Sequence, residues 1–170
     1  RKGCVVDALT LFIIRRLAIE DVILEICGPI GVTETSIDVF RGRRDEIELH
    51  GGKPFTVISW RDGKYYREEI SEATISQALD LAKNDLSWIQ ANCDILPADS
   101  DHDLSSNVRE ISKKYRRDIF DPILAALGSN RLLLCEDFIY RSLASSLKLS
   151  NNTWLQPVLL TARDRKILSL

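Results

Sequence analysis

The clearest hydrophobic pattern in the chain begins with the four apolar residues Leu132–Cys135. Two carboxylates, Glu136 and Asp137, end this run, and from Phe138 onward the apolar positions recur at helical spacing. A continuous apolar run is typical of a strand that is buried on both faces. The pattern therefore predicts a buried strand that carries two acids to its C-terminal end, where open α/β sheets bind ligands. Asp137 also suits the N-cap of the next helix and an i,i+4 pair with Arg141, so a purely structural role stays open.

The same order of elements opens the chain. Cys4–Val6 form a short apolar run, Asp7 follows it, and the pattern over 8–17 is helical. The helical pattern continues over 19–27, after which a Gly-Pro pair predicts a break. Residues 30–33 are then a second candidate for a short strand. The sequence therefore predicts a strand, an acid and a helix in succession both at the start of the chain and from residue 132 onward.

The middle of the chain predicts a helix, a hairpin and a long helix. Thr35 or Ser36 can cap a helix that runs to about residue 47. Alternating residues over 55–69, with an Asp-Gly turn between them, predict a β-hairpin inserted at the edge of the main sheet. Apolar residues at alternating spacings of four and three predict a long helix over 72–93.

The second half of the chain returns to shorter elements. A loop rich in acids is expected over 96–103, and a helix over 104–117 ends in a basic cluster. Asp121 as an N-cap and Pro122 at the first helical position predict the start of another helix. After the predicted strand over 132–135 and its helix, we expect a short strand over 153–156. A final helix should begin directly after it and reach the chain end.

Strands that alternate with helices predict an α/β fold, in which a mainly parallel central sheet is covered by helices on both faces. The length suits one domain over 1–170. Asp7 and Asp137 follow strands and so lie at the same edge of the sheet. Asp38 and Asp121 open helices that start at this edge. Converging carboxylates repel one another unless a cation neutralises them, and such oxygen ligands suit Mg²⁺ or Mn²⁺.

Composition and charge narrow the classes of protein. The chain is 45% hydrophobic and 28% charged, which is ordinary for a globular domain. A net charge of -2 gives no general attraction to nucleic acid, so such binding needs a local basic patch. No apolar run is as long as a membrane span, and no segment has the layout of a secretory signal. The chain starts without methionine and contains none, and we therefore expect a fragment of a longer protein.

The cysteines indicate the compartment. Cys4, Cys27, Cys93 and Cys135 are far apart in apolar surroundings, and none forms a Cys-x-x-Cys pair. Buried free thiols in a reducing compartment explain this pattern better than zinc ligands or disulfides. We expect a cytoplasmic protein.

Four short motifs resemble, in order, the acidic motifs of PIN domains, which are metal-dependent ribonucleases with a Rossmann-like sheet. They are Gly-Cys-Val-Val-Asp7, Thr-Glu-Thr-Ser-Ile-Asp38, Phe-Asp121-Pro-Ile-Leu and Leu-Leu-Leu-Cys-Glu-Asp137. The last motif, followed by Trp154-Leu-Gln156, is similar to PIN-type domains attached to helical-repeat regions in larger bacterial proteins. The resemblance covers nearly the whole chain. It implies a single PIN-like domain with a three-layer Rossmann-like fold, to which the hairpin and the long helix are additions.

The resemblance also implies site residues. The acidic catalytic and metal-binding residues would be Asp7, Asp38, Asp121, Asp137 and, for the metal alone, Glu136. Glu34 is an alternative to Asp38, because the second acid of the family is commonly Glu. Asp118 is an alternative to Asp121.

The favoured hypothesis is a Mg²⁺- or Mn²⁺-dependent endoribonuclease. The metal would activate a water molecule and polarise the phosphate of an RNA substrate. Two basic clusters are the candidates for phosphate contacts, and each also suits a solvated helix face. Their members are Arg41, Arg43, Arg44, Lys113, Lys114, Arg116 and Arg117.

Two other classes compete with the nuclease. A catalytically inactive PIN-like module could serve as a scaffold or regulatory domain, with neighbouring domains of the longer protein, or a second copy of itself, as partners. A phosphoacceptor receiver domain also gathers acids at strand ends, but it needs a lysine at the end of a late strand. None of the late strand candidates ends in lysine, so the receiver ranks last.

Overall fold

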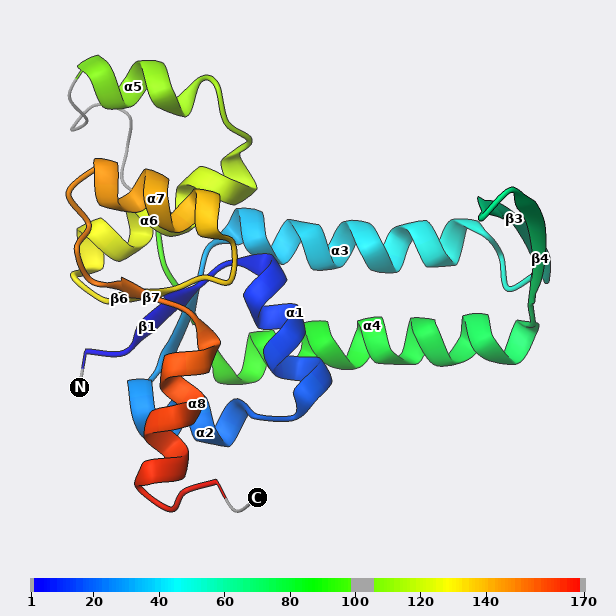
Figure 1. Cartoon of the computed structure of the whole chain (residues 1–170), viewed down its shortest axis with the longest axis horizontal. Coiled ribbons are helices and arrows are strands. Elements are labelled where there is room, and N and C mark those ends of the chain that lie inside the picture. The colour runs from blue at the N-terminus through cyan, green and yellow to red at the C-terminus, as the bar shows by residue number, and fades with distance from the viewer. Residues whose placement is uncertain (1, 99–105, 169–170) are drawn as a thin grey trace. The chain divides into compact units, whose positions relative to one another are not determined.

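The computed structural model describes residues 2–98 and 106–168 (Figure 1). The chain divides into two compact units, which are described separately below. The first unit combines residues 1–39 with residues 91–170, and the second is Phe40–Gln90. The predicted loop over 96–103 falls largely outside the described residues.

The first unit is built on a parallel sheet. Its five strands have the order β5-β2-β1-β6-β7, and every neighbouring pair is parallel. The strands are short and are β1 (Cys4–Val6), β2 (Ile30–Val32), β5 (Asp94–Ile95), β6 (Leu132–Leu134) and β7 (Asn152–Thr153). This arrangement confirms the predicted α/β class with a mainly parallel sheet. The two-residue strand β5 was not predicted, because it follows the long helix without an apolar run.

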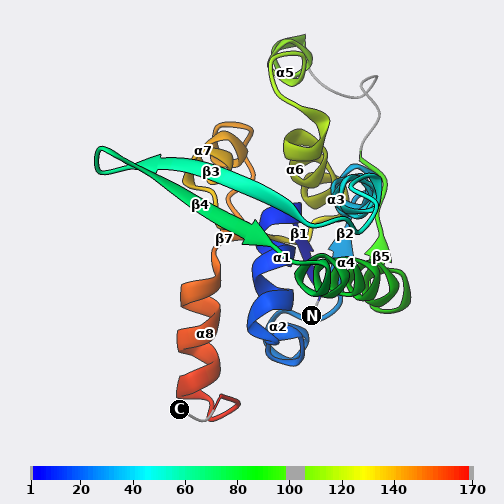
Figure 2. The ribbon, with the colours of Figure 1, turned by 90° about the vertical axis from the view of Figure 1, so that its right-hand side faces the viewer.

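Helices connect successive strands of this sheet. They are α1 (Ala8–Leu17), α2 (Glu20–Cys27), α3 (Glu34–Leu49), α4 (Glu72–Asn92), α5 (Ser106–Ser112), α6 (Arg117–Ser129), α7 (Phe138–Ser146) and α8 (Leu155–Asp164). In Figures 1 and 2, α6 and α7 cover one face of the sheet, and α2 and α8 lie on the other. The first unit therefore has three layers, as expected of a Rossmann-like fold.

Alternate strand residues supply the cores of the two faces. Val5, Leu133 and Cys135 are buried with Phe120 and Leu124 of α6. Cys4, Val6 and Leu134 alternate with them and are also fully buried. Because both faces are covered, the central strands β1 and β6 have unbroken apolar sequences, which is the pattern that identified them.

Several helix boundaries differ from the prediction. Helix α3 starts at Glu34, because the Thr33 hydroxyl caps it by accepting the Ser36 N–H at 3.3 Å. Helix α6 starts at Arg117, so Pro122 lies inside it and the predicted start at Asp121 is wrong. Pro122 is the sixth residue of α6 and lies just beyond the first four, whose N–H groups have no acceptor within the helix, so it removes one helical hydrogen bond near the helix start.

The C-terminal half shows two further differences. Helix α5 ends at Ser112, so residues 113–116 of the basic cluster form the connection to α6 and Arg117 begins α6, in place of the end of one long helix. Helix α8 begins at Leu155 and ends at Asp164, and it does not reach the chain end.

The second unit contains the remainder of α3, most of α4 and a β-hairpin. The hairpin strands β3 (Phe55–Arg61) and β4 (Lys64–Ile70) pair antiparallel, as predicted. They form a two-stranded sheet of their own, so the expected position at the edge of the main sheet is wrong. Nearly all hairpin residues are exposed, including the large side chains of Ile58, Trp60 and Tyr65. In α4 the predicted stripe is buried at Ile75, Ala82, Leu86 and Ile89.

No helix in the described parts of the chain has the length and apolar character that crossing a membrane requires.

Candidate functional site

Asp7 stands at the carboxyl end of β1 and is tied to the end of β6. Its carboxylate caps α1 by accepting the Leu9 N–H at 3.2 Å, and it accepts a hydrogen bond from the Thr10 hydroxyl. The same hydroxyl oxygen accepts the N–H of Glu136 at 2.8 Å. Thr10 therefore bridges the ends of the two central strands and fixes the orientation of the Asp7 carboxylate.

Asp7 is buried, with 4% of its surface exposed. Burial raises the pKa of its carboxyl, while hydrogen bonds from Thr10 and Cys135 act in the opposite direction. The Cys135 thiol has a raised pKa as well, first through its burial and then through the negative charge of Asp7. A buried carboxylate with a raised pKa is a group whose charge a bound cation would stabilise.

Asp121 is the second buried acid, with 5% of its surface exposed. It lies in the N-terminal half of α6, the helix that leads into β6. Its two carboxylate oxygens have different partners: Thr35 Oγ1 donates to one at 3.1 Å, and Arg117 Nε donates to the other at 3.3 Å. Because Thr35 begins α3, this hydrogen bond joins the segment after β2 to α6.

Asp137 caps α7, as predicted. Its Oδ1 accepts the N–H groups of Ile139 at 2.7 Å and Tyr140 at 3.3 Å. Within the described residues no hydrogen bond involves its other oxygen, Oδ2. The cap therefore occupies one oxygen and leaves the second available to a ligand.

Glu136, expected as a metal ligand, has a structural partner. Its Oε1 accepts the backbone N–H of Leu155 at 2.6 Å and so serves the first turn of α8. The Arg141 guanidinium donates to the carbonyl oxygens of Cys135 and Glu136 at 2.7 and 2.8 Å and lies over the Trp154 ring. Arg141 thus holds the turn after β6 through its carbonyls.

The two alternatives for the second acid lie on successive turns of α3. Glu34 is its first residue and Asp38 follows one turn later, and both are exposed. The alternative to Asp121 is Asp118, which forms a two-pronged ion pair with Arg116 at 3.0 and 2.9 Å. Asp118 is more exposed than Asp121 and has its own cation.

The acids at the carboxyl edge of the sheet also affect the Tyr140 hydroxyl. Its pKa is raised, first by burial and then by the charges of Asp137, Asp118 and Asp7. Asp7 and Asp137, which follow β1 and β6, therefore act on one phenol together with Asp118 of α6. We call the set Asp7, Asp121 and Asp137 the acidic edge.

The acidic edge suits a hard cation in its donor chemistry. Among the described residues, no three His, Cys, Asp or Glu side chains are close enough together to form a metal cluster. Mg²⁺ usually keeps several waters and needs only one or two protein carboxylates, so such a cluster is not required. One or two of these carboxylates are therefore enough protein ligands for a largely hydrated divalent ion.

The expected basic residues separate into two groups. In the first unit, Arg116 and Arg117 form ion pairs with acids, and Lys113 and Lys114 are exposed beside them. Lys113 and Lys114 make no ion pair within the part of the chain that the structure describes. The other group, Arg41, Arg43 and Arg44, belongs to the second unit.

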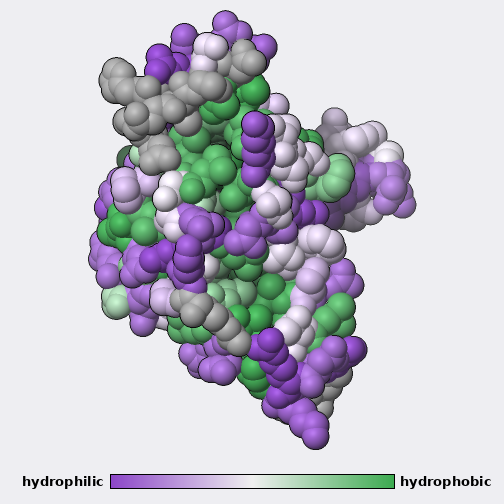
Figure 3. Space-filling view, turned by 90° about the vertical axis from the view of Figure 1, so that its left-hand side faces the viewer, coloured by the Kyte–Doolittle hydropathy of each residue, from purple (hydrophilic) through white to green (hydrophobic). Residues whose placement is uncertain are grey.

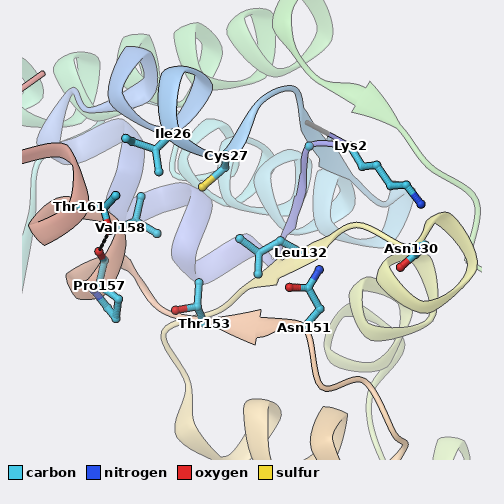
Figure 4. Close-up of a pocket in the computed structure, with 11 residues that line it drawn as sticks. Lys2, Ile26, Cys27, Asn130, Leu132, Asn151, Thr153, Pro157, Val158 and Thr161 are labelled. Atoms are coloured by element: carbon cyan, nitrogen blue, oxygen red, sulfur yellow. Dashed lines mark hydrogen bonds between the residues drawn. The ribbon is translucent and has the colours of Figure 1, made fainter. Parts of the chain in front are cut away.

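A pocket of about 610 Å³ lies at the opposite edge of the sheet, where the strands begin (Figure 4). Gly3 precedes β1, Leu132 begins β6 and Asn151 precedes β7, and all three line it. Figure 3 views this edge and shows hydrophobic residues in its hollow with hydrophilic residues around them. None of the predicted site residues lines this pocket. It is therefore separate from the acidic edge.

Four residues were not predicted to belong to the candidate site, namely Thr10, Thr35, Cys135 and Tyr140. Thr10 follows Asp7 by three residues, which is the spacing at which a helix cap meets a side chain of the first turn. That spacing could have identified it. Thr35 was considered only as a cap, and its bond to Asp121 spans 86 residues. Nothing local in the sequence indicates that contact.

The comparisons with known proteins support the fold and the order of the motifs. Residues 5–146 match the model of a family, PIN-TPR-GreABC, described as the PIN domain associated with the TPR-GreAB-C-PIN system. The comparisons with curated proteins and with solved structures gave no match. The family match spans most of the chain and contains every residue of the acidic edge. The chain therefore belongs to the PIN domains associated with the TPR-GreAB-C-PIN system.

Proposed function

We propose that this PIN domain is a ribonuclease that uses Mg²⁺ or Mn²⁺ at the acidic edge. The observation that carries the proposal is the burial of two acids, Asp7 after β1 and Asp121 in α6. A hydrogen bond from Thr35 joins Asp121 to the segment after β2, and Asp137 follows β6. Burial of the Asp7 charge is costly, because within the described residues its partners are hydrogen-bond donors and not cations. A bound cation would repay that cost.

Asp7, Asp121 and Asp137 would hold the ion, and Asp38 or Glu34 would complete the site from α3. A divalent ion supplies a bound water of lowered pKa and polarises the scissile phosphate. Thr10 keeps Asp7 oriented, and Thr35 does the same for Asp121, so neither carboxylate must reorganise when it binds the ion. Arg117, paired with Asp121, is 67% exposed and could release that acid and turn to a phosphate.

The substitution Asp137→Asn tests the proposal. Asparagine caps helices about as well as aspartate, so the free energy of unfolding should change by only about a few tenths of a kcal/mol. Cleavage of a single-stranded RNA in Mn²⁺ should fall to background, because the change removes a negative ligand. Wild-type cleavage by a well-folded Asp137→Asn protein would refute the role of Asp137.

A non-catalytic PIN module is the second candidate, because several acids already have structural partners. Glu136 serves α8, Asp137 caps α7, and Arg116 neutralises Asp118. This candidate predicts that wild-type protein cleaves no RNA and that Mn²⁺ leaves its melting temperature unchanged. In that case the neighbouring domains of a larger TPR-containing system would be its partners, as the family description suggests.

A further inference from the structure

The second unit contains a pocket that nothing in the acidic edge explains. It has a volume of about 300 Å³ and lies between α3 and α4. Three cations, two polar residues and one apolar residue line it, namely Arg41, Arg44, Lys83, Ser87, Gln90 and Leu86. No acidic side chain is among these lining residues. We call this set the basic pocket.

Helical spacing builds the basic pocket from both sides. Arg41 and Arg44 are three residues apart on α3, and Lys83, Ser87 and Gln90 follow at steps of four and three on α4. Residues at these spacings share one helix face. Leu86 is buried and forms the apolar floor. The cations are thus held around a concave surface by two regular helices.

Two of the cations of the basic pocket form ion pairs with neighbouring acids. Arg44 Nε donates to Asp45 at 2.8 Å, and Lys83 Nζ lies 3.3 Å from Glu48. Both pairs are substantially exposed: the Asp45 and Glu48 side chains are 53% and 45% exposed. Exposed ion pairs of this kind contribute little to stability, so an anion inside the pocket can compete with them.

We propose that the basic pocket binds a phosphate group of an RNA backbone. Arginine donates in a planar fork that matches phosphate oxygens, lysine adds a point charge, and Ser87 and Gln90 add neutral donors. This inference rests on the proposed function, because RNA is the substrate of that function. It assigns Lys83, Ser87 and Gln90 to substrate binding and separates Arg41 and Arg44 from Arg43, which does not line the pocket.

The test uses the full chain in EDTA, so that binding is measured without cleavage. The triple variant Arg41→Gln/Arg44→Gln/Lys83→Gln empties the pocket of charge. The control Lys53→Gln/Arg61→Gln/Lys64→Gln removes three exposed cations from the second unit that do not line the pocket. A fluorescent single-stranded oligouridylate reports binding, and thermal melting reports folding.

The pocket variant should weaken binding about tenfold and lower the slope of log Kd against log salt by about 0.7–1.4, which is one or two phosphates at about 0.7 each. The control should lose less in both measures. Equal losses in the two variants would overturn the proposal. If the triple variant fails to fold, the single change Lys83→Gln at an exposed position provides the same comparison against Lys64→Gln.

A second measurement separates RNA from free phosphate. Inorganic phosphate and oligouridylate are each titrated into ¹⁵N-labelled protein. Both should shift the amides of Ser87 and Gln90, and excess phosphate should displace the RNA from them. Shifts with phosphate alone would overturn the RNA assignment, as would shifts with neither.

The two proposals fail in different ways. RNA binding at the pocket without any cleavage by wild-type protein in Mn²⁺ would sink the nuclease and leave the pocket standing. Normal cleavage together with unchanged RNA binding by the pocket variant would refute the pocket proposal and leave the nuclease proposal standing.

Discussion

The acidic edge and the basic pocket hold charge in opposite ways. At the acidic edge, Asp7 and Asp121 are buried and hydrogen-bonded, and their burial is an energetic cost that a cation would relieve. At the basic pocket, Arg44 and Lys83 remain partly exposed and paired with exposed acids. Under the two proposals, the first site is organised before its ligand binds, whereas at the second an RNA phosphate replaces the acids that pair with the cations.

Mn²⁺ should give the largest effect that separates the two regions. At a concentration one hundred times its Kd, an ion that binds only the folded state stabilises it by about 2.7 kcal/mol. The melting temperature of wild-type protein and of the basic-pocket triple variant should rise alike. Asp7→Asn should lose this rise. If neither millimolar Mn²⁺ nor EDTA changes the melting temperature of the wild-type protein, the acidic edge binds no stabilising cation.

Thr10→Val tests whether the acidic edge is organised in advance. The change deletes the hydroxyl between Asp7 and the Glu136 N–H, so it leaves a buried acceptor and a backbone donor without partners. Chemical denaturation should show a loss of about 1–3 kcal/mol. Thr10→Ser keeps the hydroxyl and should lose much less. Equal losses would mean that the hydroxyl bridge contributes no more to stability than the methyl group of Thr10 does, and would contradict its role as the organising contact.

The pH dependence of stability sharpens the same point. Because burial raises the pKa of Asp7 in the folded state, the folded protein binds its proton more tightly than the unfolded chain does. The resulting stabilisation is fully present below the unfolded pKa and is lost as pH rises through the folded pKa. In EDTA, the melting temperature of Asp7→Asn relative to wild type should therefore increase from pH 4 to pH 8. A difference that is constant or falls over this range contradicts the raised pKa.

The smallest effect is expected at the connection between α5 and α6. Arg116 and Arg117 already pair with Asp118 and Asp121, so only Lys113 and Lys114 are available to phosphate without breaking an ion pair at this connection. Lys113→Ala/Lys114→Ala should lower the salt slope of RNA binding by at most about 1.4, or about 0.7 for each contact. If this double variant lowers the salt slope by more than the basic-pocket triple variant does, the connection and not the basic pocket is the main RNA contact.

The local pattern of apolar and polar residues predicted the helices and strands better than it predicted the contacts between them. The apolar runs at Cys4–Val6 and Leu132–Leu134 identified the central strands because both of their faces are buried. The cap at Asp137 was also correct. The start of α6 was misplaced, because Pro122 suits a first helical position and the sequence could not show that Arg117 begins the helix.

The candidate site depended on long-range contacts that no local pattern carries. The order of the acidic motifs indicated which strand and helix ends would carry acids. It did not indicate that Thr35 would bond Asp121 or that Glu136 would serve α8. Likewise, Arg41 and Arg44 were singled out as a cluster, but Lys83 lies about forty residues away and joins them only because α3 and α4 form one pocket. Pairing between distant helices is a property of packing and not of spacing in sequence.

The most direct test of the central claim is the anomalous scattering of Mn²⁺ in crystals of the protein. The account predicts an Mn²⁺ peak at the carboxyl edge of the sheet, with oxygens of Asp7, Asp121 or Asp137 among its ligands and water completing the coordination. The peak should disappear in Asp7→Asn crystals grown in the same way. Saturating Mn²⁺ that leaves this edge empty, or binds only elsewhere, would contradict the claim that these carboxylates hold a catalytic ion.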